Sequence, residues 1–187
     1  MEILIITGPP YSGKGTQCLA LKNILGFKHI STGDRCRLEK RNNSYIGRIL
    51  SKYETLGELV PDHIMRKLLN RILDENVNER GLILDGYPRT INQVNYLLKL
   101  VKLKVISINK VFQIEVEKKE LIKRGIHRAT KSNRQDDQDP RIRERRIEIY
   151  EKMIKPSIEH MKTKLNVFTC YSDGTKEELT QKIIVEL

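Results

Sequence analysis

The residues best suited to chemistry lie near the start of the chain, in a loop rich in glycine. The segment Gly8-Pro9-Pro10-Tyr11-Ser12-Gly13-Lys14-Gly15-Thr16 follows an apolar run and precedes a helical pattern. In that context, glycines let backbone N–H groups converge on phosphate oxygens at a helix N-terminus. Lys14 would bring its charge to the terminal phosphates, and Thr16 a hydroxyl near phosphate or Mg²⁺. We therefore predict a triphosphate site made by Gly8, Pro10, Ser12, Gly13, Lys14, Gly15 and Thr16.

A second segment, farther along, ends an apolar run with a carboxylate. Leu82–Asp85 reads as a buried strand that delivers Asp85 to the carboxyl edge of a sheet, where ligands of open α/β sheets bind. Asp85 could there orient waters on Mg²⁺, an ion that keeps much of its hydration shell. Arg89 follows after a turn and offers a planar fork suited to phosphate. We predict that this segment faces the phosphate loop.

Arginines recur at selected spacings in the second half of the chain. Arg124 and Arg128 are four apart on a predicted helix and share a face, and Arg134 follows in a polar stretch. Of the arginines in the next helix, we expect Arg146 rather than Arg145 to reach the cleft. At about 100° per residue, Arg146 flanks the apolar stripe of that helix, whereas Arg145 lies nearly opposite it. The set predicts a site for several phosphates.

Apolar β-type runs alternate with helical patterns along the chain, and these elements must position the residues described above. Such alternation indicates an α/β fold with a five-stranded parallel sheet flanked by helices. The expected strands are Ile3–Thr7, Lys28–Ile30, Leu82–Asp85, Val111–Glu115 and Val167–Tyr171. The expected helices cover 14–25, several short pieces across 33–73, then 90–100, 117–128, 140–161 and 175–187. The polar stretch Thr130–Gln138 has no apolar side chain, so we expect a solvent-exposed flap or loop there.

Several of these motifs together resemble the adenylate kinase and UMP/CMP kinase family. The resemblance rests on Gly-Lys-Gly-Thr-Gln from Gly13, Ser-Thr-Gly-Asp from Ser31, Asp85-Gly86-Tyr87-Pro88-Arg89 and the spacing of Arg128 and Arg134 before Asp136-Asp137. It spans nearly the whole chain. It implies a phosphate-loop kinase fold of one domain, with core 1–30, 61–127 and 139–187, an acceptor-binding helical insert 31–60 and a short lid 128–138.

The same resemblance assigns roles to the remaining candidates. The acceptor AMP would contact Thr32, Gly33, Arg37, Glu58, Leu59, Val60, Gly86, Arg89 and Gln93. The donor ATP would also contact Arg124, Gly174 and Lys176, and catalysis would involve Lys14, Arg89, Arg128, Arg134 and Arg146. The metal would be Mg²⁺, held through water by Asp85 and by Thr16. For Ser31 to Arg37 taken alone, a helix cap followed by a surface arginine is the favoured explanation.

The reaction implied is ATP + AMP ⇌ 2 ADP. Thr32, Thr90 and Gln93 follow the adenylate kinase version of the motifs, and a glutamine can pair with an adenine edge. A UMP/CMP kinase of the same fold remains an alternative. More remote alternatives are a basic nucleic-acid-binding protein built on a kinase fold, and an ATPase or GTPase switch.

Bulk properties narrow the possible partners and the compartment. The 187 residues carry a net charge of +11, which two polyphosphate substrates explain as well as a nucleic acid does, so nucleic acid is the less favoured partner. Cys18, Cys36 and Cys170 lack paired spacing, which argues against a zinc site and a disulfide framework. With neither a presequence nor a membrane span expected, we predict a cytoplasmic protein. As a separate expectation, the protein is a monomer.

Three positions depart from the family pattern. Tyr11 stands where a glycine is usual in the phosphate loop, Asn133 replaces a lid glycine, and Pro140 belongs to a one-residue insertion. If the backbone at position 11 requires φ > 0 or close approach to phosphate, a tyrosine would strain it.

Overall fold

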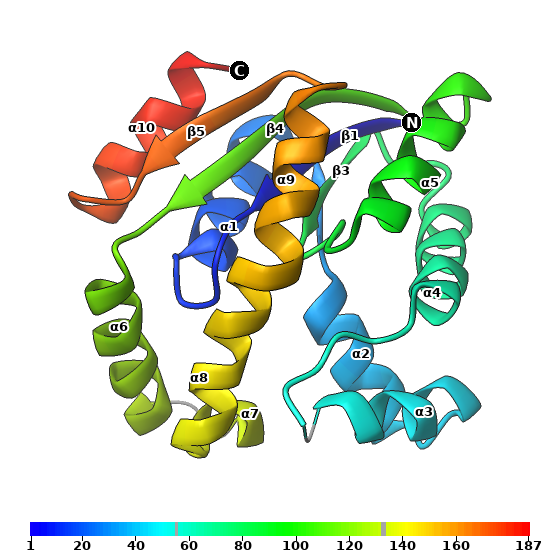
Figure 1. Ribbon diagram of the computed structural model, residues 1–187. Coiled ribbons are helices and arrows are strands. Elements are labelled where there is room, and N and C mark those ends of the chain that lie inside the picture. The colour runs from blue at the N-terminus through cyan, green and yellow to red at the C-terminus, as the bar shows by residue number, and fades with distance from the viewer. Residues whose placement is uncertain (55, 132–133) are drawn as a thin grey trace.

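The computed structural model describes residues 1–54, 56–131 and 134–187, so the expectation for Asn133 lies outside the described residues. Its centre is a parallel sheet with the strand order β2-β3-β1-β4-β5 (Figure 1). The strands are β1 (Glu2–Thr7), β2 (Lys28–Ser31), β3 (Gly81–Asp85), β4 (Ser107–Glu115) and β5 (Val167–Tyr171). The predicted five-stranded parallel α/β fold is therefore confirmed.

Strand β4 starts earlier than the sequence indicated. The prediction began at Val111, where the apolar run starts, whereas the strand begins at Ser107. Its first residues, Ser107 to Lys110, alternate between exposed and half-buried, because they lie at the margin of the sheet where water meets one face. A register shift between Ile3 and Leu4 of β1 accommodates this extra pairing.

Ten α-helices occupy the described ranges, and they cover both faces of the sheet. They are α1 (Lys14–Leu25), α2 (Thr32–Arg41), α3 (Tyr45–Glu54), α4 (Asp62–Glu75), α5 (Ile91–Lys102), α6 (Lys118–Lys131), α7 (Gln135–Gln138), α8 (Pro140–Ile149), α9 (Lys155–Lys162) and α10 (Lys176–Val185). Figure 1 shows α1 and α10 on one side of the sheet and α4, α5 and α9 on the other. No helix in the described ranges is both long and apolar enough to cross a membrane.

Each face of the sheet has its own core, because successive side chains of a buried strand point in opposite directions. Ile3 and Ile5 of β1 pack with Leu68, Leu97 and other side chains of α4, α5 and α9. Leu4 and Ile6 of β1 pack with side chains of α1 and α10, among them Cys18, Leu21 and Ile183. These two cores fix the carboxyl ends of all five strands, and hence the loops that follow them.

The long helix predicted over 140–161 forms with one irregular turn. A π-helical turn, Tyr150–Ile154, joins α8 to α9, and the Lys155 N–H donates to the carbonyl of Tyr150, five residues back. Pro156 is the second residue after the turn. Proline has no N–H and its ring crowds the carbonyl four residues before it, which explains the wider turn at this point.

The polar stretch Thr130–Gln138 differs from the expected exposed flap. Helix α6 continues to Lys131, and Gln135–Gln138 form the short helix α7. Asp136 and Asp137 are buried, although no apolar residue accompanies them. Arginine partners from α6 and α8 explain this burial, because a carboxylate leaves water at acceptable cost only when it is paired and hydrogen-bonded.

Candidate functional site

A cleft of about 590 Å³ opens where the strands end, and residues of α6, α7 and α8 and of α2 and α3 line it. Figure 1 shows these two groups of helices at opposite sides of the lower half of the molecule. Most of the predicted site residues line it. They are Gly8, Pro10, Ser12, Gly13, Lys14, Gly15, Thr16, Thr32, Gly33, Arg37, Glu58, Leu59, Val60, Asp85, Gly86, Arg89, Gln93, Arg124, Arg128, Arg134 and Arg146. The fold thus brings together segments that are far apart in the sequence, including six arginines.

The phosphate loop joins β1 to α1, and its shape depends on glycine at the first position. Gly8 has φ of +143°, and a Cβ there would lie 2.4 Å from the carbonyl oxygen of Ile114. Lys14 Nζ donates to the carbonyls of Gly8 at 2.9 Å and Pro9 at 2.6 Å. Burial lowers the pKa of Lys14 to about 8, although Asp85 opposes the shift. Nucleotide phosphates would supply the counter-charge that this ammonium lacks.

Tyr11, the residue that departs from the family pattern, is buried beside α6 and α8. Its backbone has φ of +68°, a left-handed conformation that costs a non-glycine residue roughly 1–2 kcal/mol. The ring packs with Leu121 and Ile147, and it faces Gly125 so closely that a Cβ there would meet the ring at 3.2 Å. Strain at position 11 was therefore correctly anticipated, and packing of the ring offsets it.

Two cleft arginines converge on the same tyrosine and on a buried carboxylate. The guanidinium carbons of Arg128 and Arg146 lie 4.6 and 5.4 Å from the centre of the Tyr11 ring. Arg128 binds Asp137 with two hydrogen bonds of 2.8 and 2.7 Å. Arg146 donates to Asp136 at 2.7 Å and to Asp137 at 2.9 Å, and the Tyr11 hydroxyl donates to Asp137 at 3.2 Å. Phosphate loop, α6, α7 and α8 thus share one polar network.

The charge of this network determines how Asp137 titrates. Burial alone raises the pKa of the Asp137 carboxyl, but hydrogen bonds and charge from Arg128 and Arg146 bring it below its ordinary value. Asp137 is therefore ionised at neutral pH and holds both arginines in place. Arg145, by contrast, is exposed and pairs with Glu148 at 3.3 Å and Glu58 at 3.8 Å, so it is Arg146 that lines the cleft.

Arg124 is fixed between α6 and the loop after β5. Its guanidinium donates to Glu120 at 2.9 Å, and to the side chain and the carbonyl of Ser172 at 3.1 and 3.2 Å. Gly174 and Lys176, which were predicted beside it, do not line the cleft. Lys176 is the exposed first residue of α10, and its carbonyl accepts from Gln17 of α1 at 3.0 Å, so the start of α10 is attached to α1.

On the opposite side of the cleft, α2 presents the acceptor-side candidates. Thr32 donates to the carbonyl of Asp85 at 3.1 Å, which joins α2 to the end of β3. Arg37 pairs with Asp34 at 2.5 Å, and Arg134, from the other side, reaches the same carboxylate at 3.5 Å. Arg89 donates to the carbonyl of Gly86 at 2.7 Å, and burial lowers its pKa. Three arginines thus lie on this side of the cleft, and two of them share the carboxylate of Asp34.

Gln93 lines the cleft but already has partners within the protein. Its carbonyl accepts from the Arg89 backbone N–H at 2.8 Å, and its amide nitrogen donates to Asp62 at 2.8 Å. One lone pair and one amide hydrogen remain. The edge-to-edge pairing with adenine expected from the sequence would have to use these remaining groups.

The residues near Asp85 are compatible with Mg²⁺. The carboxylate is at the end of β3 and lines the cleft together with Thr16. A Cβ on Gly15 would already contact Asp85 Oδ2 at 3.6 Å, so glycine leaves room beside this oxygen. Few protein oxygens and open space are what an ion that keeps several waters requires.

Sequence reasoning missed the buried acids and one histidine. Asp136 and Asp137 entered only as a spacing motif, yet they orient Arg146 and Arg128. His29 lines the cleft from β2 and lies 3.4 Å from Asp85, a contact that the spacing of β2 and β3 could not indicate. Only the pairing of these two strands, with His29 opposite Ile83, brings them together.

Comparisons with known proteins agree with this geometry. The adenylate kinase family model matches residues 6–166. The chain is 32% identical to an adenylate kinase of Hydrogenobaculum sp. (strain Y04AAS1), a match covering 97% of this chain and 98% of that protein. It is 34% identical to adenylate kinases of Parabacteroides distasonis, over 96% and 94% of the two chains, and of Leptospira biflexa serovar Patoc, over 98% of each. The chain therefore belongs to the adenylate kinase family.

Proposed function

We propose that this protein transfers the γ-phosphoryl group of ATP to AMP reversibly, in an Mg²⁺-dependent reaction. The observation that carries the proposal is the single cleft in which the phosphate loop, Asp85 and six arginines meet. The relatives are named adenylate kinases, and the family model covers most of the chain. The chain is accordingly a nucleoside-monophosphate kinase, and the choice of AMP is the finer part of the proposal.

On the donor side, the phosphate loop would hold the triphosphate through its backbone N–H groups. Lys14 would exchange its contacts with the carbonyls of Gly8 and Pro9 for the terminal phosphates. Arg124 would present the flat face of its guanidinium to the adenine, because three hydrogen bonds already fix its plane. Gly174 and Lys176 remain candidates for contacts made only with nucleotide bound.

On the acceptor side, Arg37 and Arg89 would bind the phosphate of AMP with forked hydrogen bonds. Thr32, Gly33, Gly86 and the segment Glu58–Val60 line the same half of the cleft and would surround the base. Gln93 would contribute the one donor and one acceptor that its internal hydrogen bonds leave over.

Catalysis would come from position and charge. Phosphoryl transfer needs in-line placement of the two phosphates and neutralisation of the oxygens between them. Lys14, Arg89, Arg128, Arg134 and Arg146 would surround those oxygens. The acceptor phosphate is already a nucleophile, so no side chain needs to act as a base. Closure of the lid 128–138 and the insert 31–60 over the core would exclude water, which otherwise competes as acceptor.

Asp85 and Thr16 would hold the metal ion, Asp85 through bound water. When bound, Mg²⁺ supplies positive charge that neutralises the triphosphate oxygens. Asp85 also lies near Lys14, whose pKa it raises against the effect of burial, so it helps to keep that lysine protonated.

The direct test is a coupled assay of the purified protein with MgATP and each of AMP, CMP, UMP and dTMP. Activity with AMP at least ten times that with the pyrimidine nucleotides is expected. A preference for CMP or UMP would contradict the choice of acceptor and favour a UMP/CMP kinase. No transfer to any acceptor, by protein that is folded by circular dichroism, would contradict the activity itself.

The remaining parts of the proposal are the compartment, the oligomeric state and the partners. A cytoplasmic monomer with ATP, AMP and ADP as partners fits a chain whose cysteines form no disulfide in the described residues. The net charge of +11 is concentrated partly in the cleft arginines, so substrates account for it without a nucleic-acid partner.

A further inference from the structure

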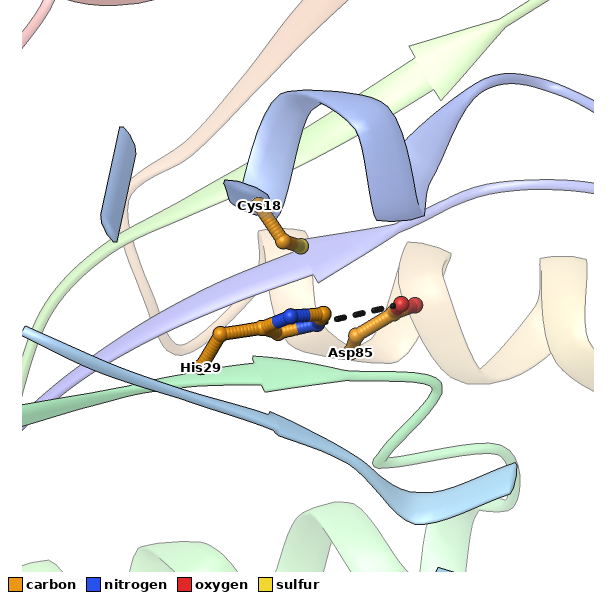
Figure 2. A group of neighbouring side chains, drawn as sticks. All are labelled: Cys18, His29 and Asp85. Atoms are coloured by element: carbon orange, nitrogen blue, oxygen red, sulfur yellow. Dashed lines mark ion pairs between the residues drawn. The ribbon is translucent and has the colours of Figure 1, made fainter. Parts of the chain in front are cut away.

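Three side chains with metal-binding atoms meet beneath the cleft, where α1, β2 and β3 come together. Cys18, His29 and Asp85 point toward one another, as Figure 2 shows. The thiol sulfur, one imidazole nitrogen and one carboxylate oxygen all lie within 4.8 Å of one another. From these side chains we infer a binding site for a thiophilic divalent cation such as Zn²⁺, which shares Asp85 with the Mg²⁺ position and adds Cys18 and His29 as ligands.

The donor set fits zinc in type and in charge. Thiolate, imidazole and carboxylate are the three ligand classes that zinc takes, whereas Mg²⁺ prefers oxygen donors. A thiolate and a carboxylate would together neutralise the two positive charges of the ion. Zinc with three protein ligands keeps a fourth position for water. His29 and Asp85 line the cleft, so that position would face the open side.

The geometry requires only a small adjustment. Ligand atoms around tetrahedral zinc are separated by about 3.5 Å, given bonds of about 2.0 to 2.3 Å. His29 Nε2 and Asp85 Oδ2 are already 3.4 Å apart. Any other separation in the group is at most 4.8 Å, so the thiol needs to approach by no more than about 1.3 Å.

An independent observation also indicates a missing ligand. His29 Nε2 is buried and has no hydrogen-bond partner in the described part of the chain, despite its closeness to Asp85. Buried polar atoms almost always have a partner, since leaving one without a partner is unfavourable. A metal ion would satisfy this nitrogen. Cys18 is wholly buried, and its thiol points toward His29 and Asp85.

Occupation of this site would inhibit the kinase reaction, a consequence that depends on the proposed function. Asp85 is the carboxylate expected to hold the waters of Mg²⁺, and it supports the charge of Lys14. A zinc ion bound to Asp85 would withdraw it from both roles. The binding itself does not depend on whether the protein phosphorylates AMP.

The test begins with nucleotide-free protein, stripped by a chelator and titrated with Co²⁺. The thiolate-to-cobalt charge-transfer band in the near ultraviolet is expected at one ion per chain, and Zn²⁺ should abolish it. Cys18→Ser and His29→Gln should each weaken Co²⁺ binding by more than about 100-fold, the upper end of the effect of removing an outer-shell partner. Cys170→Ser, which alters a buried cysteine of β5, is the matched control and should keep the band.

Absence of the band in the wild type, or its survival in Cys18→Ser, would overturn the site. Cys18→Ala serves if the serine variant does not fold, as judged by circular dichroism. In the kinase assay with excess Mg²⁺, Zn²⁺ should inhibit the wild type at least ten times more strongly than Cys18→Ser, each relative to its own rate. Equal inhibition would overturn the regulatory consequence and leave the binding site intact.

Discussion

At the scale of single residues, Lys14 and Asp137 show two ways in which the fold surrounds a buried charge. Lys14 contacts two backbone carbonyls, and burial brings its pKa to about 8. Asp137 shows the opposite arrangement, because two arginines and a tyrosine hydroxyl surround one buried carboxylate. The lysine has a positive charge to offer to phosphate, and the aspartate fixes the positive charges nearby.

The titration of Lys14 predicts how ATP capture depends on pH. Because burial lowers the pKa of Lys14 to about 8, this lysine in the free protein loses its charge as pH rises through that value. Because kcat/KM reports the free enzyme, kcat/KM for ATP should fall above that pH. At saturating ATP, the phosphates raise the pKa of Lys14, so kcat should decline only at higher pH. A kcat/KM profile that stays flat to about pH 9.5 would contradict the role of Lys14.

Replacing Asp137 should destabilise the fold. Asp137→Asn leaves Arg128 and Arg146 without their shared counter-charge, and we expect a loss of about 2 kcal/mol in urea unfolding. This is less than for a fully buried pair, since both arginines are partly exposed. The folded pKa of Asp137 is depressed, so its contribution exists at neutral pH and is lost as pH falls below 3.8.

The matched control for that prediction is Asp139→Asn. Asp139 pairs with Arg141, which is 91% exposed, and it caps α8 through the Arg141 N–H. Asparagine caps helices equally well, so the change should stay within about 0.5 kcal/mol. Equal effects of the two substitutions would mean that the buried network contributes nothing beyond a surface pair.

At the scale of elements, the phosphate loop and α6 are fitted to each other. Tyr11 adopts a conformation usually reserved for glycine, and α6 carries a glycine in its middle where alanine would be the better helix former. Both features are unfavourable by themselves. They become understandable together, because the Tyr11 ring occupies the space next to Gly125.

A double-mutant cycle tests this fit. Gly125→Ala should gain little in the wild type, because the added methyl would meet the ring at 3.2 Å. In a Tyr11→Gly background the ring is absent, and the same change should stabilise the helix by about 1 kcal/mol. The free energies of unfolding should therefore show a coupling of about 1 kcal/mol. Additive effects would contradict a direct contact.

Tyr11→Gly should also separate donor from acceptor binding. Without the ring, Arg128 and Arg146 lose the surface on which they rest, and the KM for ATP should rise several-fold. The KM for AMP should change less, because Arg37 and Arg89 do not contact Tyr11 in the described structure. Tyr11→Phe keeps the ring and should preserve both KM values.

At the scale of the whole molecule, the cleft is bounded by two groups of helices, and weak ion pairs join its two sides. Arg134 meets Asp34 at 3.5 Å, and Arg145 meets Glu58 at 3.8 Å. All four side chains are at least about a third exposed, so these pairs contribute little, and substrate phosphates can replace them. We therefore expect the two substrates to stabilise the closed arrangement jointly.

Limited proteolysis can measure that closure. With EDTA present to prevent turnover, ATP and AMP together should slow trypsin cleavage between Arg128 and Arg143 by more than the product of their separate effects. Cleavage after Lys104, in an exposed turn beyond α5, should not change. Simple multiplication of the two protections would mean that the sites close independently.

The sequence alone determined the features that depend on local pattern. The apolar runs predicted β1, β2, β3 and β5 to within a residue or two, because buried parallel strands need continuous apolar sequence. The phosphate loop, Asp85 and the arginine spacing indicated a kinase of the right family. Periodicity also indicated that Arg146, and not Arg145, faces the cleft.

Only the tertiary structure decided which side chains from distant parts of the sequence form ion pairs or come together in one site. The sequence shows Asp137 as part of a polar flap, yet arginines from two other helices make its burial possible. Likewise, the wide spacing of the cysteines argued against a zinc site, whereas the pairing of β2 with β3 and the packing of α1 bring Cys18, His29 and Asp85 together. Such contacts depend on the three-dimensional arrangement of separate elements, which hydrophobic periodicity along one chain does not encode.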